Sequence, residues 1–274
     1  MDEIYERILD LRKKGEEAVL VTVVEKEGST PAPPGTKMLV QADGTTLGTV
    51  GGGALERLAA AKALELLGQQ NSALVRYALW GEDQVGEEEA TGMICGGRVA
   101  LFFEYLGYAA RAYLFGAGHV GRSVARYLRA LRWFVTVIDE RQSFAANVSG
   151  ANRIIIADYA SALTDEALPS GGFYVIATPS HDSDYLVLKR ILSSTWKPRY
   201  VGMVASRRKT VEFCERLAAD LGKDLDLSLL YAPVGLDLGG RSPDEVALSI
   251  VAEMQALRYG KTGHKHMRLL PERQ

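Results

Sequence analysis

The chain has 274 residues, with 32 Lys and Arg against 34 Asp and Glu, which gives a formal net charge of −2. Hydrophobic residues make up 47% of the sequence and charged residues 24%, which is typical of a globular protein and excludes wholesale disorder. The near-neutral charge argues against a nucleic-acid-binding protein, whose surface would be basic. Glycine is in excess at 28 residues, so some segments must turn tightly or approach a ligand closely.

The cysteines and the N-terminus indicate the compartment. Cys95 and Cys214 form no CxxC pair, which argues against a zinc site or a disulfide framework and favours a reducing compartment. The first 17 residues are charged throughout and do not resemble a signal peptide. The longest apolar runs, such as 19–24, have the length of a strand and not of a membrane span. We therefore expect a cytoplasmic protein that does not cross a membrane.

Residues 1–108 predict one compact α+β unit. Apolar side chains at helical spacing open the chain, and an Asp-Gly turn joins two strands into a hairpin. A triple glycine leads directly into a helix rich in Ala, Leu and Glu, which favour helices. The expected elements are helices over 4–13 and 54–67, and strands over 18–24, 37–41, 45–50, 73–79 and 98–105.

Residues 109–258 alternate between strands and helices, which predicts βαβ units and a parallel sheet. The last helix starts at Ser242, where Ser-Pro-Asp-Glu supplies a cap, a first-turn proline and Glu245 for a capping box. Residues 259–274 form a basic tail that we expect to fray. The expected strands cover 111–115, 134–139, 153–157, 173–178 and 200–206, and the expected helices lie near 120–131, 161–168, 183–193 and 208–221.

A Gly-x-Gly-x-x-Gly fingerprint at Gly116, Gly118 and Gly121 stands between a strand and a helix. Such glycines let backbone N–H groups reach a pyrophosphate at the helix N-terminus. Asp139 ends the next predicted strand, where an acid would hold a ribose 2′-hydroxyl, so it favours NAD over NADP. The neighbouring Arg141 makes that preference modest. Strand, glycines, helix and acid together predict a Rossmann-like dinucleotide-binding domain.

Three more polar residues follow strand ends in this domain. His119 lies inside the fingerprint and suits a phosphate contact. His181 follows the fourth strand at the carboxyl edge of the sheet, where ligands bind, but a role in helix capping explains it equally well. Arg207 belongs to a basic cluster after the fifth strand, which suits a phosphate or simply a solvated helix start. No evident catalytic acid–base set accompanies these residues.

Two segments of the first unit provide turns and open backbone. The segment 28–35 is stiffened by three prolines and carries the hydroxyls of Ser29 and Thr30. Gly51, Gly52 and Gly53 place bare backbone directly before a helix, which makes a second anion site.

Cys95 stands before Gly96 and Gly97, and Arg98 follows. A cysteine among free N–H groups and beside a cation ionises readily and gains thiolate character. A small core residue is the alternative for an isolated cysteine, but the glycine setting favours a reactive thiol. Cys214 is expected to pack in the core.

These segments resemble the XdhC/CoxI family, accessory factors for xanthine dehydrogenase and related molybdenum hydroxylases. The resemblance covers nearly the whole chain. It rests on EKEGSTPAPPGTKMLV, DGTTLGTVGGGALE, GMICGGRVALFFE, FGAGHVGRSVARYL with VTVIDER, YVGMVASRRK, and APVGLDLGGRSPDEVALSIVAEM. It implies an XdhC/CoxI domain over 1–108 and a Rossmann-like domain over 109–258. Many relatives read GGGC where this chain has Gly53-Ala54, so one of two family cysteines is missing, which puts a cysteine-pair mechanism in doubt.

The resemblance implies a chaperone that binds molybdenum cofactor, protects it during sulfuration by a cysteine desulfurase, and delivers it to the apo-form of a molybdenum hydroxylase. Two glycine-rich helix starts suit the phosphate or nucleotide of molybdopterin, and a thiolate at Cys95 suits a place near the molybdenum. A homodimer would bring two domains around one cofactor. The predicted cofactor-binding residues are Ser29, Thr30, Gly51, Gly52, Gly53, Cys95, Gly96, Gly97, Gly116, Gly118, His119, Gly121, Asp139, His181 and Arg207, with Cys95 as the metal ligand.

Two other functions stay open. An NAD(P)-dependent oxidoreductase of unknown substrate would explain the fingerprint and Asp139. An interaction scaffold would use both glycine clusters only for turns. The chain is too short, and has too few cysteines for iron–sulfur clusters, to be the hydroxylase itself.

Overall fold

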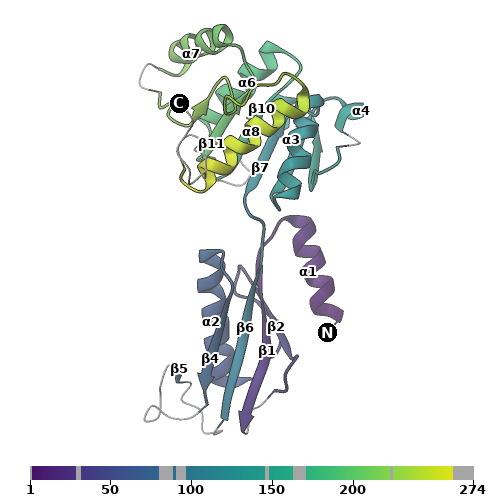
Figure 1. Ribbon diagram of the computed structural model, residues 1–274, viewed down its shortest axis with the longest axis vertical. Coiled ribbons are helices and arrows are strands. Elements are labelled where there is room, and N and C mark those ends of the chain that lie inside the picture. Colours follow the sequence, from purple (N-terminus) through teal and green to yellow (C-terminus); the bar gives the residue numbers. More distant parts are fainter. Residues whose placement is uncertain are drawn as a thin grey trace, which may run out of the picture. The chain divides into compact units, whose positions relative to one another are not determined.

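The computed structural model describes residues 2–28, 32–79, 89–90, 97–145, 148–162, 171–222 and 225–261. The chain divides into two compact units, Met1–Tyr108 and Ala109–Gln274 (Figure 1). We call them unit 1 and unit 2 and describe each by itself.

Unit 1 combines two helices with a six-stranded, mostly antiparallel sheet. Its elements are α1 (Asp2–Lys14), β1 (Ala18–Gly28), β2 (Lys37–Gln41), β3 (Thr46–Gly48), α2 (Gly53–Gln69), β4 (Ala73–Ala78), β5 (Glu89–Ala90) and β6 (Gly97–Leu106). The strand order is β3-β2-β1-β6-β4-β5, and only the short β5 runs parallel to its neighbour.

The predicted helices and strands of unit 1 are present, with one informative difference. β1 does not end near residue 24 but continues to Gly28, after a register shift between Val23 and Glu25. Such a bulge inserts an extra residue and bends the strand. The extension brings the start of the proline-rich segment to the start of β6, where Gly28 pairs with Gly97.

Alternate residues of β1 pack on opposite faces of the sheet, as the period of a strand requires. Val19 and Val21 belong to a core that includes the buried side of α2, whereas Leu20 packs with Ile4 and Leu11 of α1. The α1 face of the sheet is only partly covered, because Leu74 on β4 remains 49% exposed.

Unit 2 is a parallel sheet with helices on both faces. Its strands are β7 (Arg111–Phe115), β8 (Phe134–Asp139), β9 (Arg153–Ile156), β10 (Phe173–Ile176), β11 (Tyr200–Met203) and β12 (Leu230–Tyr231). Its helices are α3 (His119–Ala130), α4 (Gln142–Ala145), α5 (Tyr159–Ala162), α6 (His181–Ser193), α7 (Arg207–Leu221) and α8 (Pro243–Arg258).

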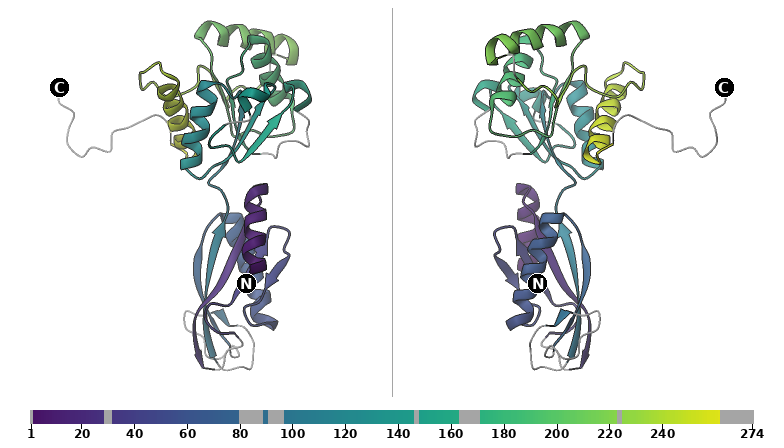
Figure 2. Two further views of the ribbon diagram at one scale, coloured as in Figure 1. Left: turned by 90° about the vertical axis from the view of Figure 1, so that its right-hand side faces the viewer. Right: turned by 90° about the vertical axis from the view of Figure 1, so that its left-hand side faces the viewer.

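The strand order β12-β11-β10-β7-β8-β9 is that of the doubly wound dinucleotide-binding fold. Residues of α3 and α8 pack on one face of the sheet, and residues of α6 and α7 pack on the other (Figure 2). The predicted fold class, an α+β unit followed by a Rossmann-like parallel-sheet unit, is confirmed. The strand order reverses between β7 and β10, and ligands of this fold bind at the carboxyl ends of such strands.

The helix expected near 161–168 starts earlier, as α5, and residues 163–170 lie outside the described residues. The short α4, β5 and β12 were not predicted. The capping box of α8 is present, with Ser242 and Glu245 bonded reciprocally. Residues 262–274 of the predicted tail are likewise outside the described part. None of the described helices is long and apolar enough to cross a membrane.

Candidate functional site

One end of the unit 1 sheet brings the glycine segments together. Gly28, the last residue of β1, pairs with Gly97, the first residue of β6. β4 runs antiparallel to β6 and starts at Ala73, at the opposite end of the sheet. Only three residues separate the end of α2 from Ala73, and α2 is 17 residues long, roughly 25 Å. It therefore begins near the Gly28–Gly97 pair, and we call Gly28, Gly97 and residues 51–53 the glycine end (Figure 1).

The glycine end borders several predicted site residues. Ser29 and Thr30 follow Gly28 in the chain, and Cys95 and Gly96 precede Gly97. These four residues lie outside the described residues. The strand pairing nevertheless places the described neighbours of both segments side by side.

The anion site predicted at residues 51–53 is filled by a carboxylate of the same chain. All three glycines have positive φ, at 127°, 82° and 63°. The Glu56 Oε1 atom accepts hydrogen bonds from the N–H groups of Gly52, at 2.9 Å, and Val50, at 3.2 Å, and from the Thr49 hydroxyl. Glu56 is the fourth residue after the N-cap Gly52, one position beyond the place of a capping-box glutamate, so the sequence pattern did not predict these bonds.

Glu56 is held in its charged form. Burial alone would raise the pKa of Glu56, but the hydrogen bonds from Thr49 and from the backbone N–H groups outweigh burial and lower it. At neutral pH the carboxylate is therefore ionised, and it occupies N–H groups that an external anion would otherwise bind.

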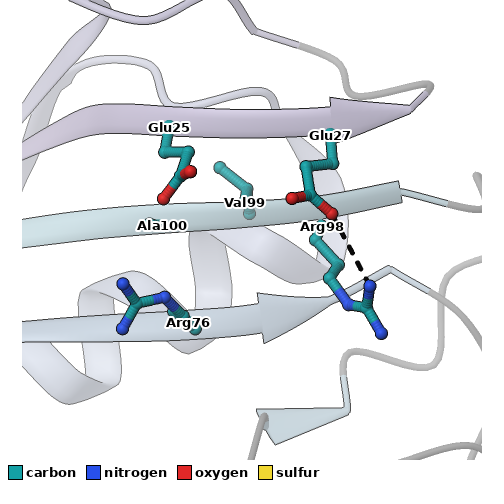
Figure 3. Close-up of a pocket in the computed structure, with 6 residues that line it drawn as sticks. All are labelled: Glu25, Glu27, Arg76, Arg98, Val99 and Ala100. Atoms are coloured by element: carbon teal, nitrogen blue, oxygen red, sulfur yellow. Dashed lines mark ion pairs between the residues drawn. The ribbon is translucent and has the colours of Figure 1, made fainter.

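A pocket of about 240 Å³ lies on the face of the unit 1 sheet opposite α2, near the ends of β1 and β4 and the start of β6 (Figure 3). We call it the charged pocket. It is lined by Glu25, Glu27, Arg76, Arg98, Val99 and Ala100. Sequence analysis named only Arg98 here, because the acids and arginines come from three strands whose register is not visible in the sequence.

The three fingerprint glycines of unit 2 have different tasks. A Cβ atom on Gly116 would fall on the carbonyl oxygen of Ala177, at the end of β10, and one on Gly121 would fall on the carbonyl oxygen of Gly116. A Cβ on Gly118 would meet nothing within 4 Å. Gly116 and Gly121 therefore allow the loop to pack, whereas Gly118 borders open space that a ligand could enter.

Asp139 lies beneath this loop and is fully buried, at 0% exposed. Its Oδ2 atom accepts from the Ala117 N–H at 2.6 Å and from Arg141 Nη2 at 2.7 Å. Its Oδ1 atom accepts from the Arg141 N–H at 2.8 Å and Nε at 2.9 Å. These four bonds saturate the carboxylate, so Asp139 braces the glycine loop and presents no free oxygen to a ribose.

His119 is exposed at the start of α3, where it lines a second pocket of about 330 Å³. The pocket lies between the first turns of α3 and α8 and includes Arg122 and Arg126. An exposed ion pair joins Arg126 to Asp244, with 2.5 Å between Nη2 and Oδ1. The contact of His119 with a phosphate stays a prediction.

His181 and Arg207 are exposed first residues of α6 and α7. The helix caps are the preceding serines, Ser180 and Ser206, whose hydroxyls accept from the N–H groups of Ser183 and Lys209.

Behind these helix starts lies a buried ion pair that sequence reasoning missed. The Asp184 carboxylate pairs with the Lys209 ammonium, and their side chains are only 5% and 9% exposed. Thr178 also donates to Asp184, from its N–H at 2.9 Å and its hydroxyl at 2.6 Å. Lys209 belongs to the basic cluster predicted after the fifth strand, but no sequence signal distinguishes it from the exposed arginines before it.

Metal-binding groups and thiols are few in the described part of the chain. Within it, no cluster of three or more His, Cys, Asp or Glu side chains could hold a metal ion. Cys214 is half-buried on α7, and burial raises the pKa of its thiol. Cys214 is thus only partly buried and is not among the fully buried core residues, where the sequence had led us to expect it. The predicted metal ligand, Cys95, is outside the described residues.

Family models match both units. A model described as the XdhC and CoxI family matches residues 11–78, and one described as the XdhC Rossmann domain matches residues 112–254. The chain belongs to the XdhC and CoxI family. The resemblance recognised in the sequence is thereby confirmed, and each match falls inside one structural unit of this XdhC/CoxI protein.

Several known proteins are similar to this XdhC/CoxI protein. An uncharacterized protein of Escherichia coli K12, YqeB, is 31% identical over 249 residues, which cover 89% of this chain and 44% of YqeB. The molybdenum cofactor insertion chaperone PaoD, also of Escherichia coli K12, is 44% identical over 63 residues, covering 23% and 20%. A protein of Bacillus subtilis 168 that is described as a probable subunit of xanthine dehydrogenase is 23% identical over 328 residues, covering 91% and 96%.

The matches span less than half the length of YqeB and PaoD. Among solved structures, a protein described as a xanthine dehydrogenase from Bacillus halodurans superposes with a TM-score of 0.49 at 22% identity, covering 94% of this chain and 96% of that one.

Proposed function

We propose that this protein binds molybdenum cofactor at the glycine end of unit 1 and, after sulfuration, delivers it to xanthine dehydrogenase or a related molybdenum hydroxylase. Family membership and the name of the relative PaoD, a molybdenum cofactor insertion chaperone, support this function. The observation that carries it is the Gly28–Gly97 pair. It joins the segment that leads to Ser29 with the one that follows Cys95, two segments that carry the family resemblance.

The chemistry proposed for unit 1 depends on Cys95. A thiolate is a soft ligand that suits molybdenum or a sulfur being transferred to it. Because Ala54 follows Gly53, we assign the sulfur-handling role to Cys95 alone. A cysteine desulfurase would supply the sulfur, and the apo-hydroxylase would receive the cofactor.

In unit 2, Gly118 is the fingerprint glycine that borders open space, and it is the glycine proposed to face a ligand of that unit. The saturation of Asp139 by Ala117 and Arg141 speaks against the oxidoreductase alternative. NAD binding through the ribose would need that carboxylate free, and freeing it would leave the Ala117 N–H and the Arg141 guanidinium without their acceptor.

Reconstitution of an apo-hydroxylase tests delivery. The apo-enzyme is mixed with this protein loaded with cofactor, a cysteine desulfurase and cysteine, and hydroxylase activity is followed over time. We expect faster and more complete activation than with the same amount of free cofactor, and no gain with the Cys95→Ala variant. Equal activation by free cofactor and by the loaded protein would overturn the delivery function.

A further inference from the structure

The charged pocket contains one carboxylate–guanidinium ion pair, and also a second carboxylate and a second guanidinium that do not pair with each other. Glu27 on β1 and Arg98 on β6 lie on neighbouring strands and form an ion pair, with 3.6 Å between Oε2 and Nη1. Glu25 on β1 and Arg76 on β4 lie on either side of β6, opposite the same residue, Ala100. Two strand spacings put their backbones roughly 10 Å apart, and their side chains form no ion pair with each other.

Glu25 and Arg76 are both exposed, and neither has an ion-pair partner among the residues that the structure describes. Figure 3 shows them on opposite sides of the pocket, with Ala100 between them. The small side chain of Ala100 is only 3% exposed and forms the floor. The pocket therefore offers a hydrogen-bond acceptor at one side and a cationic donor at the other.

This pattern suits a ligand with donors at one end and an anion at the other. A carboxylate only accepts hydrogen bonds, so Glu25 would bind an edge of the ligand that carries N–H donors. A guanidinium binds a phosphate with two parallel hydrogen bonds, so Arg76 would bind a phosphate group of the ligand. A phosphorylated pterin has both features, since its pyrimidinone ring presents an amide N–H and an amino group on one edge and its side chain ends in the phosphate.

We propose that the charged pocket binds the pterin of the cofactor, with its N–H edge on Glu25 and its phosphate on Arg76. This inference rests on the proposed function and assigns parts of the cofactor to particular residues. Residues 51–53 are the other place predicted for the phosphate, but the ionised Glu56 already accepts from the Gly52 N–H and from the Val50 N–H before it. A phosphate there would meet a like charge, whereas the arginines of the charged pocket attract it.

The pocket residue Arg98 is also close in the sequence to the proposed thiol ligand. Arg98 lines the pocket and follows Cys95 by three residues. Three residues span at most about 10 Å of extended chain.

Fluorescence titration of the full chain with a stable phosphorylated pterin and with its dephosphorylated form tests the assignment. Glu25→Gln should weaken both ligands about tenfold, the loss expected for one charge-assisted hydrogen-bonded pair. Arg76→Gln should weaken only the phosphorylated pterin, by a similar factor. Glu104→Gln, on the same sheet, and Arg129→Gln, in unit 2, are matched controls at exposed positions and should change neither affinity.

Molybdenum retention in the same variants separates this inference from the proposed function. If wild type, Glu25→Gln and Arg76→Gln retain cofactor and bind pterin equally, the pocket assignment is overturned while the proposed function stands. If the wild type binds neither cofactor nor pterin, both are overturned. If the substitutions lower the molar mass in solution but leave pterin affinity unchanged, the pocket serves self-association and the assignment is again overturned.

Discussion

Asp139 occupies the sequence position of a ribose-binding acid, yet its side chain turns toward the protein. The spacing from the fingerprint to Asp139 predicted the position at the end of β8 correctly. It did not predict that the Ala117 N–H and the Arg141 side chain would take all of the carboxylate oxygens. Spacing in a sequence fixes where a strand ends, but the direction of a side chain depends on donors that folding brings near it.

Asp139→Asn tests whether this residue braces the fold. The amide keeps the size of the side chain but loses the charge and turns an acceptor into a donor facing Ala117 or Arg141. We expect the free energy of unfolding to fall by about 1–3 kcal/mol, the usual effect of leaving buried partners unsatisfied. Urea unfolding measures it, with the exposed Asp182→Asn as control. A loss no greater than that of the control would contradict the bracing role.

The pKa of Asp139 predicts how this contribution depends on pH. Burial raises the pKa, but hydrogen bonds from Arg141 and Ala117 outweigh burial and hold it below the ordinary value of 3.8. A lowered pKa stabilises the fold at pH values above the unfolded pKa, and the stabilisation is lost as pH falls through the folded pKa. The stability difference between wild type and Asp139→Asn should therefore stay constant from pH 7 to about 5 and shrink below about pH 4. A difference that grows on acidification, in urea unfolding at these pH values, would rule this out.

At the scale of elements, periodicity predicted where most helices and strands lie in the sequence, but not which strands pair in unit 1 or in what register. The alternation of strands and helices after residue 109 indicated a parallel sheet, and the observed order of six strands agrees with it. In unit 1 the antiparallel register is the important unknown. Gly28 and Gly97 are separated by nearly 70 residues in the chain, and only the bulged extension of β1 makes them pair. The charged pocket depends on the same register, so the sequence alone could not reveal it.

The β7–α3 loop yields a prediction that separates packing from ligand approach. Gly121→Ala should destabilise unit 2 by about 1–3 kcal/mol or more, as overpacking does, because the new methyl group would meet the Gly116 carbonyl. Gly118→Ala should be nearly neutral for stability, since it faces open space. Thermal unfolding of the two variants measures the contrast, and equal shifts in Tm would show that the two glycines do not differ in this way.

At the scale of the whole molecule, each unit corresponds to its own family model and carries its own glycine-rich segment. The glycine excess seen in the composition is thus divided between two places. In unit 2 it builds a loop that packs on β10 and is braced by Asp139. In unit 1 it allows three successive positive φ angles before α2 and includes Gly28 and Gly97, which pair between β1 and β6. We therefore place the binding of the cofactor in unit 1.

The molybdenum and pterin content of the purified protein tests this placement most directly. The wild type and the Cys95→Ala and Cys214→Ala variants are produced in cells that make molybdenum cofactor, and metal and pterin are measured per chain. We expect cofactor in the wild type and in Cys214→Ala. We expect at least about tenfold less in Cys95→Ala, because even the loss of an outer partner of a metal ligand lowers metal affinity by that factor. Equal cofactor in all three proteins, or none in the wild type, would contradict cofactor binding through Cys95.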